Sequence, residues 1–207
     1  MKTKWVDGFE IHMSIDNNME LSGVEYLDIC DENGQPTGEV VDRDTAHKDG
    51  ILHRTSHVWV IRERDGQVDV LLQKRSRDKE SFPGMYDASS AGHIPAGEDP
   101  LHSIRREMSE EIGVHAEPEE LAFAGTFHCS YEERFHGEPF RDNEIRYAYV
   151  YREPVDSEKL TLQKSEVEEV RWFPLDEIAE EIQTRHDRIC VTQQGLSVLM
   201  EYLNRED

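Results

Sequence analysis

The sequence predicts an α/β (α+β) fold in which a mixed β-sheet is sandwiched between helices. Short apolar segments bounded by glycine, proline and polar turns recur along the chain, as expected for strands. An amphipathic helical pattern interrupts them at residues 100–112, and two more helical patterns follow near the C-terminal end. Strands interspersed with helices favour a layered domain with helices on both faces of the sheet.

The expected elements follow in chain order. Residues 1–24 are polar and weakly periodic, which predicts an N-terminal extension before one domain over residues 25–207. Strands are expected at 26–30, 37–42, 56–62, 68–73, near 88–91, and at 122–129, 145–151 and 167–173, with turns at 31–34, 65–66 and 82–84. Helices are expected at 100–112, 175–183 and 192–204. The polar segment 131–143 is predicted to be a long loop and a candidate substrate lid.

The net charge of the chain argues against some classes of binding partner. The chain has 45 acidic and 23 basic side chains, a formal net charge of −22, which argues against binding to nucleic-acid backbones or to anionic membranes. Its three cysteines, Cys30, Cys129 and Cys190, are far apart and fit free thiols in a reducing cytosol. The sequence shows neither a membrane-length apolar run nor a signal-peptide pattern, so we expect a cytoplasmic protein. The oligomeric state stays open, with a homodimer among the alternatives.

The helix at 100–112 carries the most informative pattern. Asp99 is a suitable N-cap, Pro100 fits the first helical position, and Gly113 ends the helix. One face is an apolar stripe of Leu101, Ile104, Met108 and Ile112. The opposite face gathers three carboxylates, Glu107, Glu110 and Glu111. Such crowding is either a solvated acidic surface or a site for a hard cation such as Mg²⁺, which prefers oxygen ligands.

Residues 92–114, GHIPAGEDPLHSIRREMSEEIGV, resemble the Nudix box at every fixed position. The resemblance implies a Nudix fold and hydrolysis of a diphosphate compound with Mg²⁺ or Mn²⁺. It implies that Glu110 and Glu111 hold the cation, and that Glu98 and Glu107 complete its shell or orient water. Arg106 would position these carboxylates, and Gly92 would let backbone approach the ligand. The general base stays open between Glu107 and Glu144.

Residues 39–152 further resemble the Nudix branch that contains isopentenyl-diphosphate isomerase. The similarity lies in the order of the AH, LH, FPG, GH and DNE motifs along the chain. It implies metal ligation by His47, His53, His93, Asp142 and Glu144, and diphosphate contact by Arg43, Arg75 and Lys79. Structural histidines, a solvated basic loop and an exposed acidic strand edge are the alternatives. His57 has no counterpart in the resemblance and is interpreted as structural.

One departure separates this chain from the isomerases. Ala91 stands where that branch carries a catalytic cysteine, and a methyl group cannot transfer a proton. We therefore expect hydrolysis of a phosphoanhydride, with an isomerase-like enzyme and a non-catalytic diphosphate sensor as alternatives. The group attached to the diphosphate stays open among nucleotides, sugar nucleotides and coenzymes. Five aromatic residues are candidates for stacking on a base or for the core: Tyr86, Phe127, Tyr131, Phe135 and Phe140.

Overall fold

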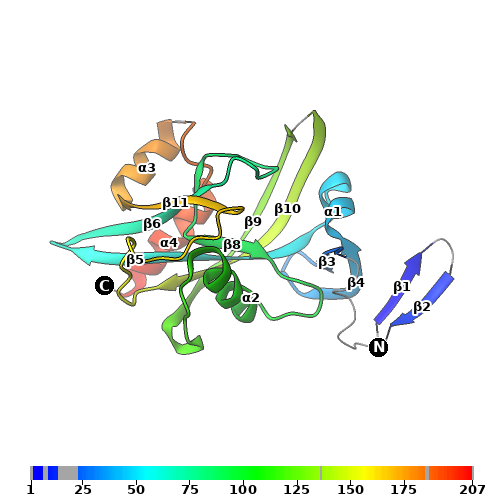
Figure 1. Cartoon of the computed structure of the whole chain (residues 1–207). Coiled ribbons are helices and arrows are strands. Elements are labelled where there is room, and N and C mark those ends of the chain that lie inside the picture. Colours follow the sequence, from blue (N-terminus) through cyan, green and yellow to red (C-terminus); the bar gives the residue numbers. More distant parts are fainter. Residues whose placement is uncertain (1, 7–8, 14–22, 136, 185–186, 207) are drawn as a thin grey trace.

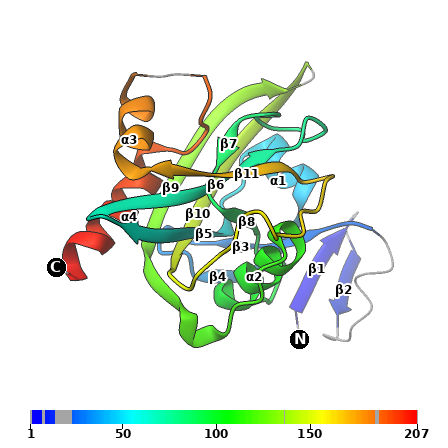
Figure 2. The same cartoon turned by 60° about the vertical axis from the view of Figure 1, so that its left-hand side comes forward.

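The computed structural model describes residues 2–6, 9–13, 23–135, 137–184 and 187–206. A seven-stranded sheet forms its centre, in the order β11-β6-β5-β10-β9, with β7 paired to β6 and β8 paired to β5 (Figures 1 and 2). The strands are β5 (His53–Arg64), β6 (Gln67–Arg75), β7 (Tyr86–Asp87), β8 (Ser90–His93), β9 (Leu121–Phe135), β10 (Glu138–Tyr151) and β11 (Val167–Pro174). The sheet is mixed because β10 and β5 are parallel while the other pairs are antiparallel.

Helices cover both faces of this sheet, which confirms the predicted α/β sandwich. Strand β5 shows why, since residues 53–61 are all buried. Val58 and Val60 pack with the apolar stripe of α2 (Pro100–Glu107) and the turn after it. Trp59 and Ile61 point to the other side and pack against α3 (Leu175–Thr184) and α4 (Gln193–Glu206). The apolar run 58–61 suits a strand that is covered on both faces, whereas the buried residues 53–57 at its start are all polar.

A smaller unit precedes the central sheet. Strands β3 (Tyr26–Cys30) and β4 (Pro36–Asp42) form an antiparallel pair, as expected, and lead into helix α1 (Arg43–Asp49). The sequence did not predict α1, because seven residues are too few to show helical periodicity. Its capping residues were nevertheless visible: the Asp42 side chain accepts a hydrogen bond from the Thr45 amide, and Gly50 closes the helix at φ 69°.

The predicted loop at 131–143 was wrong. Strands β9 and β10 pair over their whole length, from Leu121↔Tyr151 to Phe135↔Glu138, with Gly137 at φ 88° in the tight connection. The segment reads as polar because one of its faces is solvent-exposed, as at Glu132 and Arg134, while Tyr131 and Phe135 are half buried. The result is a long hairpin that projects past the rest of the sheet (Figure 1).

The first residues also form a structure that the sequence did not predict. Strands β1 (Lys2–Val6) and β2 (Phe9–Met13) pair antiparallel as a separate two-stranded sheet beside the rest of the chain (Figure 2). All three cysteines are free thiols, as expected. Among the described residues, no helix has the length and hydropathy needed to span a bilayer.

Candidate active site

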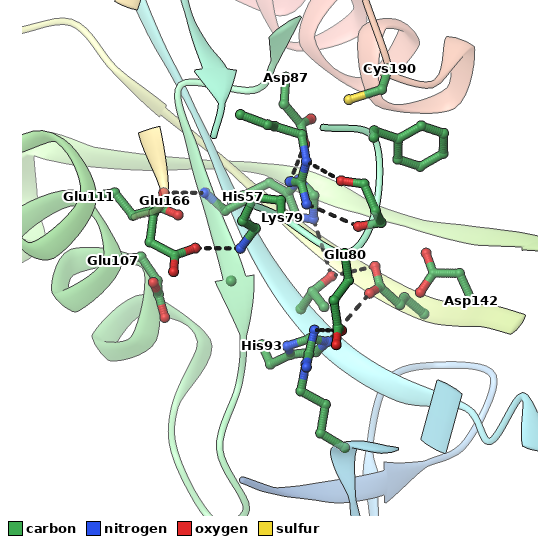
Figure 3. Close-up of a pocket in the computed structure, with 18 of the residues that line it drawn as sticks. His57, Lys79, Glu80, Asp87, His93, Glu107, Glu111, Asp142, Glu166 and Cys190 are labelled. Carbon is green, nitrogen blue, oxygen red and sulfur yellow. Dashed lines mark hydrogen bonds and ion pairs between the residues drawn. The ribbon is translucent and has the colours of Figure 1, made fainter. Parts of the chain in front are cut away.

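A cavity of about 540 Å³ opens between α2, β8 and the inner face of the β9–β10 hairpin (Figure 3). The loop after β6 and the segment before β11 close two of its sides. Its walls hold most of the residues singled out in the sequence: Arg43, His47, Arg75, Lys79, Gly92, His93, Arg106, Glu107, Glu110, Glu111, Asp142 and Glu144. The structure therefore brings the box helix and the histidine-rich motifs to one space.

Glu111 is the most firmly held carboxylate of the box. It lies in a single π-helical turn, Met108–Ile112, that continues α2 and replaces the uninterrupted α-helix expected over 100–112. Such turns are rare in proteins, and those that occur often lie at functional sites. Its Oε2 accepts hydrogen bonds from Ser90 Oγ at 2.6 Å, Gln73 Nε2 at 3.1 Å and the Ala91 amide at 3.3 Å. Burial raises the pKa of Glu111, although the hydrogen bonds from Ser90 and Gln73 oppose this rise.

Arg106 gathers the other carboxylates of the box helix. Its guanidinium lies 2.8 Å from Glu107 Oε1, 3.3 Å from Glu110 Oε2 and 3.5 Å from Glu98 Oε2. Burial, together with the charge of Glu111, raises the pKa of Glu107 to about 7 despite Arg106. Glu98 is held apart by hydrogen bonds from His102 Nδ1 at 2.6 Å and Ser103 Oγ at 2.7 Å. It reaches the carboxylate group only through Arg106.

Gly92 has a packing reason for its lack of a side chain. A Cβ built at this position would lie 2.5 Å from Glu107 Oε1, well inside van der Waals contact. Any larger residue would push the Glu107 carboxylate out of its place beside β8. The glycine that was expected to approach the ligand therefore also makes room for a carboxylate of the box.

The histidine-rich motifs form a second group. His47 of α1, His53 of β5 and His93 of β8 meet Asp142 and Glu144 of β10, whose side chains point the same way, as strand alternation predicts. His47 Nε2 lies 3.1 Å from His93 Nε2, and His53 Nε2 lies 3.5 Å from Glu144 Oε1. His47 Nδ1 and His53 Nε2 are buried ring nitrogens without a hydrogen-bond partner. Burial lowers the pKa of His47 to about 4, so its ring is neutral.

Sequence reasoning missed the residue that organises these carboxylates. The Arg146 guanidinium donates to Glu144 Oε2 at 2.7 Å and to Asp142 Oδ2 at 2.8 Å. Burial and the charge of Glu144 raise the pKa of Asp142, whereas Arg146 outweighs burial and keeps the pKa of Glu144 well below its usual range. The signal was present in the sequence, because positions 142, 144 and 146 follow the two-residue period of one strand face.

His57 and Thr55 also belong to this wall. The Thr55 hydroxyl donates to Glu144 Oε2 at 3.0 Å and lies 3.2 Å from His57 Nε2. Burial lowers the pKa of His57 to about 4. His57 was interpreted as structural, and the structure places it in the lining of the cavity, linked to Glu144 through Thr55.

The three side chains that were expected to contact phosphate differ in how firmly other residues hold them. Arg75 is locked, because its guanidinium donates to Asp87 Oδ2 at 3.1 Å and to the backbone and side-chain oxygens of Ser81 at 2.9 and 3.0 Å. Arg43 reaches Glu80 at 3.4 Å over the cavity mouth. Lys79 pairs with Glu166, a residue that the sequence reasoning did not single out.

The five candidate aromatic residues separate into two groups. Tyr86 and Phe127 pack into or against the hydrophobic core. Tyr131 and Phe140 line the cavity, and the Phe140 ring stacks on His47 with centroids 4.3 Å apart. Phe135 supports them, 5.4 Å from Phe140. These residues share the hairpin that was expected to be a loop.

Comparison with known proteins identifies the family. The NUDIX domain model matches residues 52–193. A Nudix hydrolase from Clostridium acetobutylicum, itself uncharacterized, is 34% identical over 189 residues that cover 88% of this chain and 89% of that protein. This chain belongs to the Nudix hydrolase family. Nudix hydrolase 3 of Arabidopsis thaliana is 40% identical over 74% of this chain, but the match spans 20% of the plant protein.

Solved structures support the fold of this Nudix hydrolase. DR0079 from Deinococcus radiodurans superposes with a TM-score of 0.63 at 16% identity, covering 86% of this chain and 99% of that one. The Nudix domain of Shewanella oneidensis NrtR, solved with ADP ribose, gives a TM-score of 0.52 at 17% identity over 75% of this chain and 88% of that chain. At these identities the likeness concerns the fold alone.

Proposed function

We propose that this Nudix hydrolase is a cytoplasmic enzyme that cleaves a phosphoanhydride in a nucleoside diphosphate-linked or related diphosphate compound, with Mg²⁺ or Mn²⁺. The observation that carries the proposal is the joint placement of Glu107, Glu110 and Glu111 on one cavity wall with Lys79 and Arg43 nearby. Carboxylates that repel one another attract a hard cation, and the basic side chains suit phosphate oxygens. A protein with net charge −22 needs these local positive charges to admit an anionic substrate.

The residues present fit a cation at the box helix. Glu111 has one oxygen engaged by Ser90, Gln73 and Ala91, which leaves Oε1 for a ligand, and Glu107 lies beside it. A bound Mg²⁺ or Mn²⁺ supplies charge neutralisation on phosphate and lowers the pKa of water. Arg106 keeps the carboxylates together. Glu144 is poorly suited as general base, because Arg146 and Thr55 donate to its Oε2 and its Oε1 lies 3.5 Å from His53 Nε2 and 3.9 Å from His93 Nε2.

The second group fits a further cation. His47 Nδ1 and His53 Nε2 are buried without a hydrogen-bond partner, 3.6 Å from Asp142 Oδ1 and 3.5 Å from Glu144 Oε1 respectively. His53 Nδ1 lies 2.8 Å from the Ile51 carbonyl oxygen, which fixes its proton there. Asp142 and Glu144 share the single counter-charge of Arg146. Three imidazoles, each neutral when it ligates, and two carboxylates form a donor set for Mn²⁺ or a similar ion. We propose that this site helps to hold the diphosphate at the far side of the cavity from Glu111.

A release assay tests the function. Phosphate and pyrophosphate release is measured over nucleoside diphosphates and triphosphates, sugar nucleotides, coenzymes and ADP ribose, with Mg²⁺ or Mn²⁺ and with EDTA. We expect turnover of at least one compound that EDTA abolishes. Tight binding of a compound without turnover would instead identify a sensor, and turnover that persists in EDTA would contradict the cation role.

The isomerase alternative has a test of its own. Ala91 lies on β8 next to Gly92, and no thiol occupies its place. We expect that neither the wild type nor Ala91→Cys exchanges protons of isopentenyl diphosphate with heavy water. Rapid deuterium incorporation by the variant would show an isomerase scaffold that lacks one group.

A further inference from the structure

Lys79 and Glu166 form an ion pair across the cavity, between the loop after β6 and the segment before β11. Figure 3 shows the Glu166 side chain beside Glu111 and Glu107, with its carboxylate directed at Lys79. Both side chains keep part of their surface exposed, 27% for Lys79 and 32% for Glu166. The pair is therefore accessible to an incoming anion, unlike the locked ion pair of Arg75 with Asp87, where both side chains are less than 20% exposed.

The backbone of Glu166 is anchored to the catalytic helix. Its carbonyl accepts a hydrogen bond from the Ser76 amide at 2.8 Å, and its amide donates to the Gln163 carbonyl at 2.9 Å. The Gln163 amide in turn donates to the Glu111 carbonyl at 3.0 Å. These contacts hold Glu166 in a fixed place relative to Glu111, whereas Lys79 reaches the pair on a flexible four-carbon stem.

We propose that the Lys79–Glu166 pair is opened by substrate, and that Glu166 is then the general base of the hydrolysis. This inference rests on the proposed function and adds a catalytic carboxylate from outside the box. A diphosphate carries more negative charge than one carboxylate and offers several oxygens, so it replaces Glu166 as the ion-pair partner of the Lys79 ammonium. Glu166 loses its partner while its backbone keeps the carboxylate beside Glu111.

The proton balance is simple. Glu166 accepts a proton from the attacking water as the water oxygen bonds to phosphorus. The anhydride P–O bond breaks, and its electron pair leaves with the departing phosphate oxygen. Glu166 then releases the proton to solvent at the open side of the cavity. Because Lys79 pairs with Glu166 in the absence of substrate, Glu166 is free to act as a base only while phosphate is bound.

Binding of a non-hydrolysable probe tests the exchange without turnover. Methylenediphosphonate with Mg²⁺ is titrated by calorimetry into the wild type, Glu166→Gln and Lys79→Met. We expect Glu166→Gln to bind about three- to fivefold more tightly, because the competing charge is gone, and Lys79→Met to bind about tenfold more weakly. Equal or weaker binding by Glu166→Gln would overturn the exchange.

Turnover of a substrate found in the release assay tests the base. We expect Glu166→Gln to lower kcat by about 10² to 10³ while KM stays equal or falls. Glu168→Gln is the matched control, because it removes the neighbouring ion pair with Lys74, 3.1 Å long and outside the cavity, and should leave kcat unchanged.

Three results would contradict the role of Glu166. A kcat within threefold of wild type in Glu166→Gln would mean that Glu166 forms an ion pair with Lys79 but does not act as the base. A fall of melting temperature that accompanies the loss of kcat in Glu166→Gln and in Glu166→Asp alike would show a structural role. An equal loss in Glu168→Gln would show that the effect is not local. Failure of the proposed function itself is distinct, since wild type would then hydrolyse none of the compounds.

Discussion

The cavity contains two groups of neighbouring carboxylates, one on the box helix and one on strand β10, and they differ in how exposed they and their arginine partners are. On the box helix, Glu110 is 53% exposed and its partner Arg106 is 33% exposed, so solvent and ligands can replace these contacts. On strand β10, Asp142 is 2% exposed and Arg146 is 13% exposed. Both groups therefore hold one guanidinium, but Arg106 is partly exposed to solvent whereas Arg146 is buried with its carboxylates. Under the proposed function, we therefore expect the attack of water at the helix end and a supporting role for the buried residues of β10.

The difference follows from the elements. The helix end presents three carboxylates to the cavity, of which Glu110 is exposed while Glu107 and Glu111 are largely covered. A strand between two others can hold carboxylates only where a neighbouring side chain satisfies them, as Arg146 and Thr55 satisfy Glu144. Substitutions on the helix should therefore affect catalysis before stability, and substitutions on β10 should affect both.

The largest expected effect is at Glu111. Glu111→Gln should lower kcat by about 10² to 10⁵ at saturating metal, because the amide keeps the shape but not the charge for a cation. Its melting temperature should stay close to wild type, since an amide oxygen can still accept from Ser90 and Gln73. Glu117→Gln, which removes an exposed contact with Arg105, is the control. Activity within a few-fold of wild type would end the metal role of Glu111.

The second group should bind its own ion. Crystals soaked in Mn²⁺ should show anomalous scattering at two separate positions, one beside Glu111 and one among His47, His53 and His93. His53→Gln should weaken the second position by about 10- to 100-fold and leave the first intact. His128→Gln, which alters an exposed contact with Asn143, should change neither. Scattering only at the glutamates would mean that these histidines are structural.

A smaller effect should come from the hydroxyl that holds Glu111. Ser90→Ala should raise the Mg²⁺ concentration for half-maximal activity about tenfold, with little change in substrate KM at saturating metal. Ser89→Ala offers the comparison, because this buried hydroxyl contacts only the backbone at Leu71 and Val60. A loss of melting temperature without a shift in metal dependence would assign Ser90 to packing.

The smallest effect concerns metal-free stability. The pKa of Glu107 is raised from 4.5 to about 7, so its stabilising contribution is complete below pH 4.5 and is lost as pH rises through 7. In EDTA, the melting temperature of wild type relative to Glu107→Gln should fall by about 3–6 °C between pH 5 and pH 8. Mg²⁺ should restore the difference at pH 8. A difference that does not depend on pH would contradict the raised pKa.

The sequence predicted those parts that depend on local spacing. The apolar stripe of α2, the shared face of Glu107 and Glu111, and the common direction of Asp142 and Glu144 all follow from helix and strand periods. The layered α/β fold followed from strand patterns that are interspersed with helical patterns along the chain. The turn at Asp65-Gly66 was confirmed by positive φ at both residues.

The remainder depends on contacts between distant segments. The hairpin was taken for a loop because Glu132 and Arg134 are polar, and only the pairing with β10 shows that they form a solvent face. Glu166 lies 55 to 59 positions beyond Glu111 and Glu107 in the numbering, and no motif connects them. The sequence also did not show that Ser81 and Asp87 hold the Arg75 side chain, because the turn at Phe82 brings these partners to it.

Hydrolysis in ¹⁸O-labelled water tests the central claim most directly. A substrate from the release assay is turned over in H₂¹⁸O with Mg²⁺, and each product is analysed by mass spectrometry. Attack of water on phosphorus within the cavity predicts one ¹⁸O atom in a phosphate-containing product, none in a fragment without phosphorus, and no reaction by Glu111→Gln. Label in a carbon-bound hydroxyl, or equal label from the Glu111→Gln variant, would contradict phosphoanhydride hydrolysis at this site.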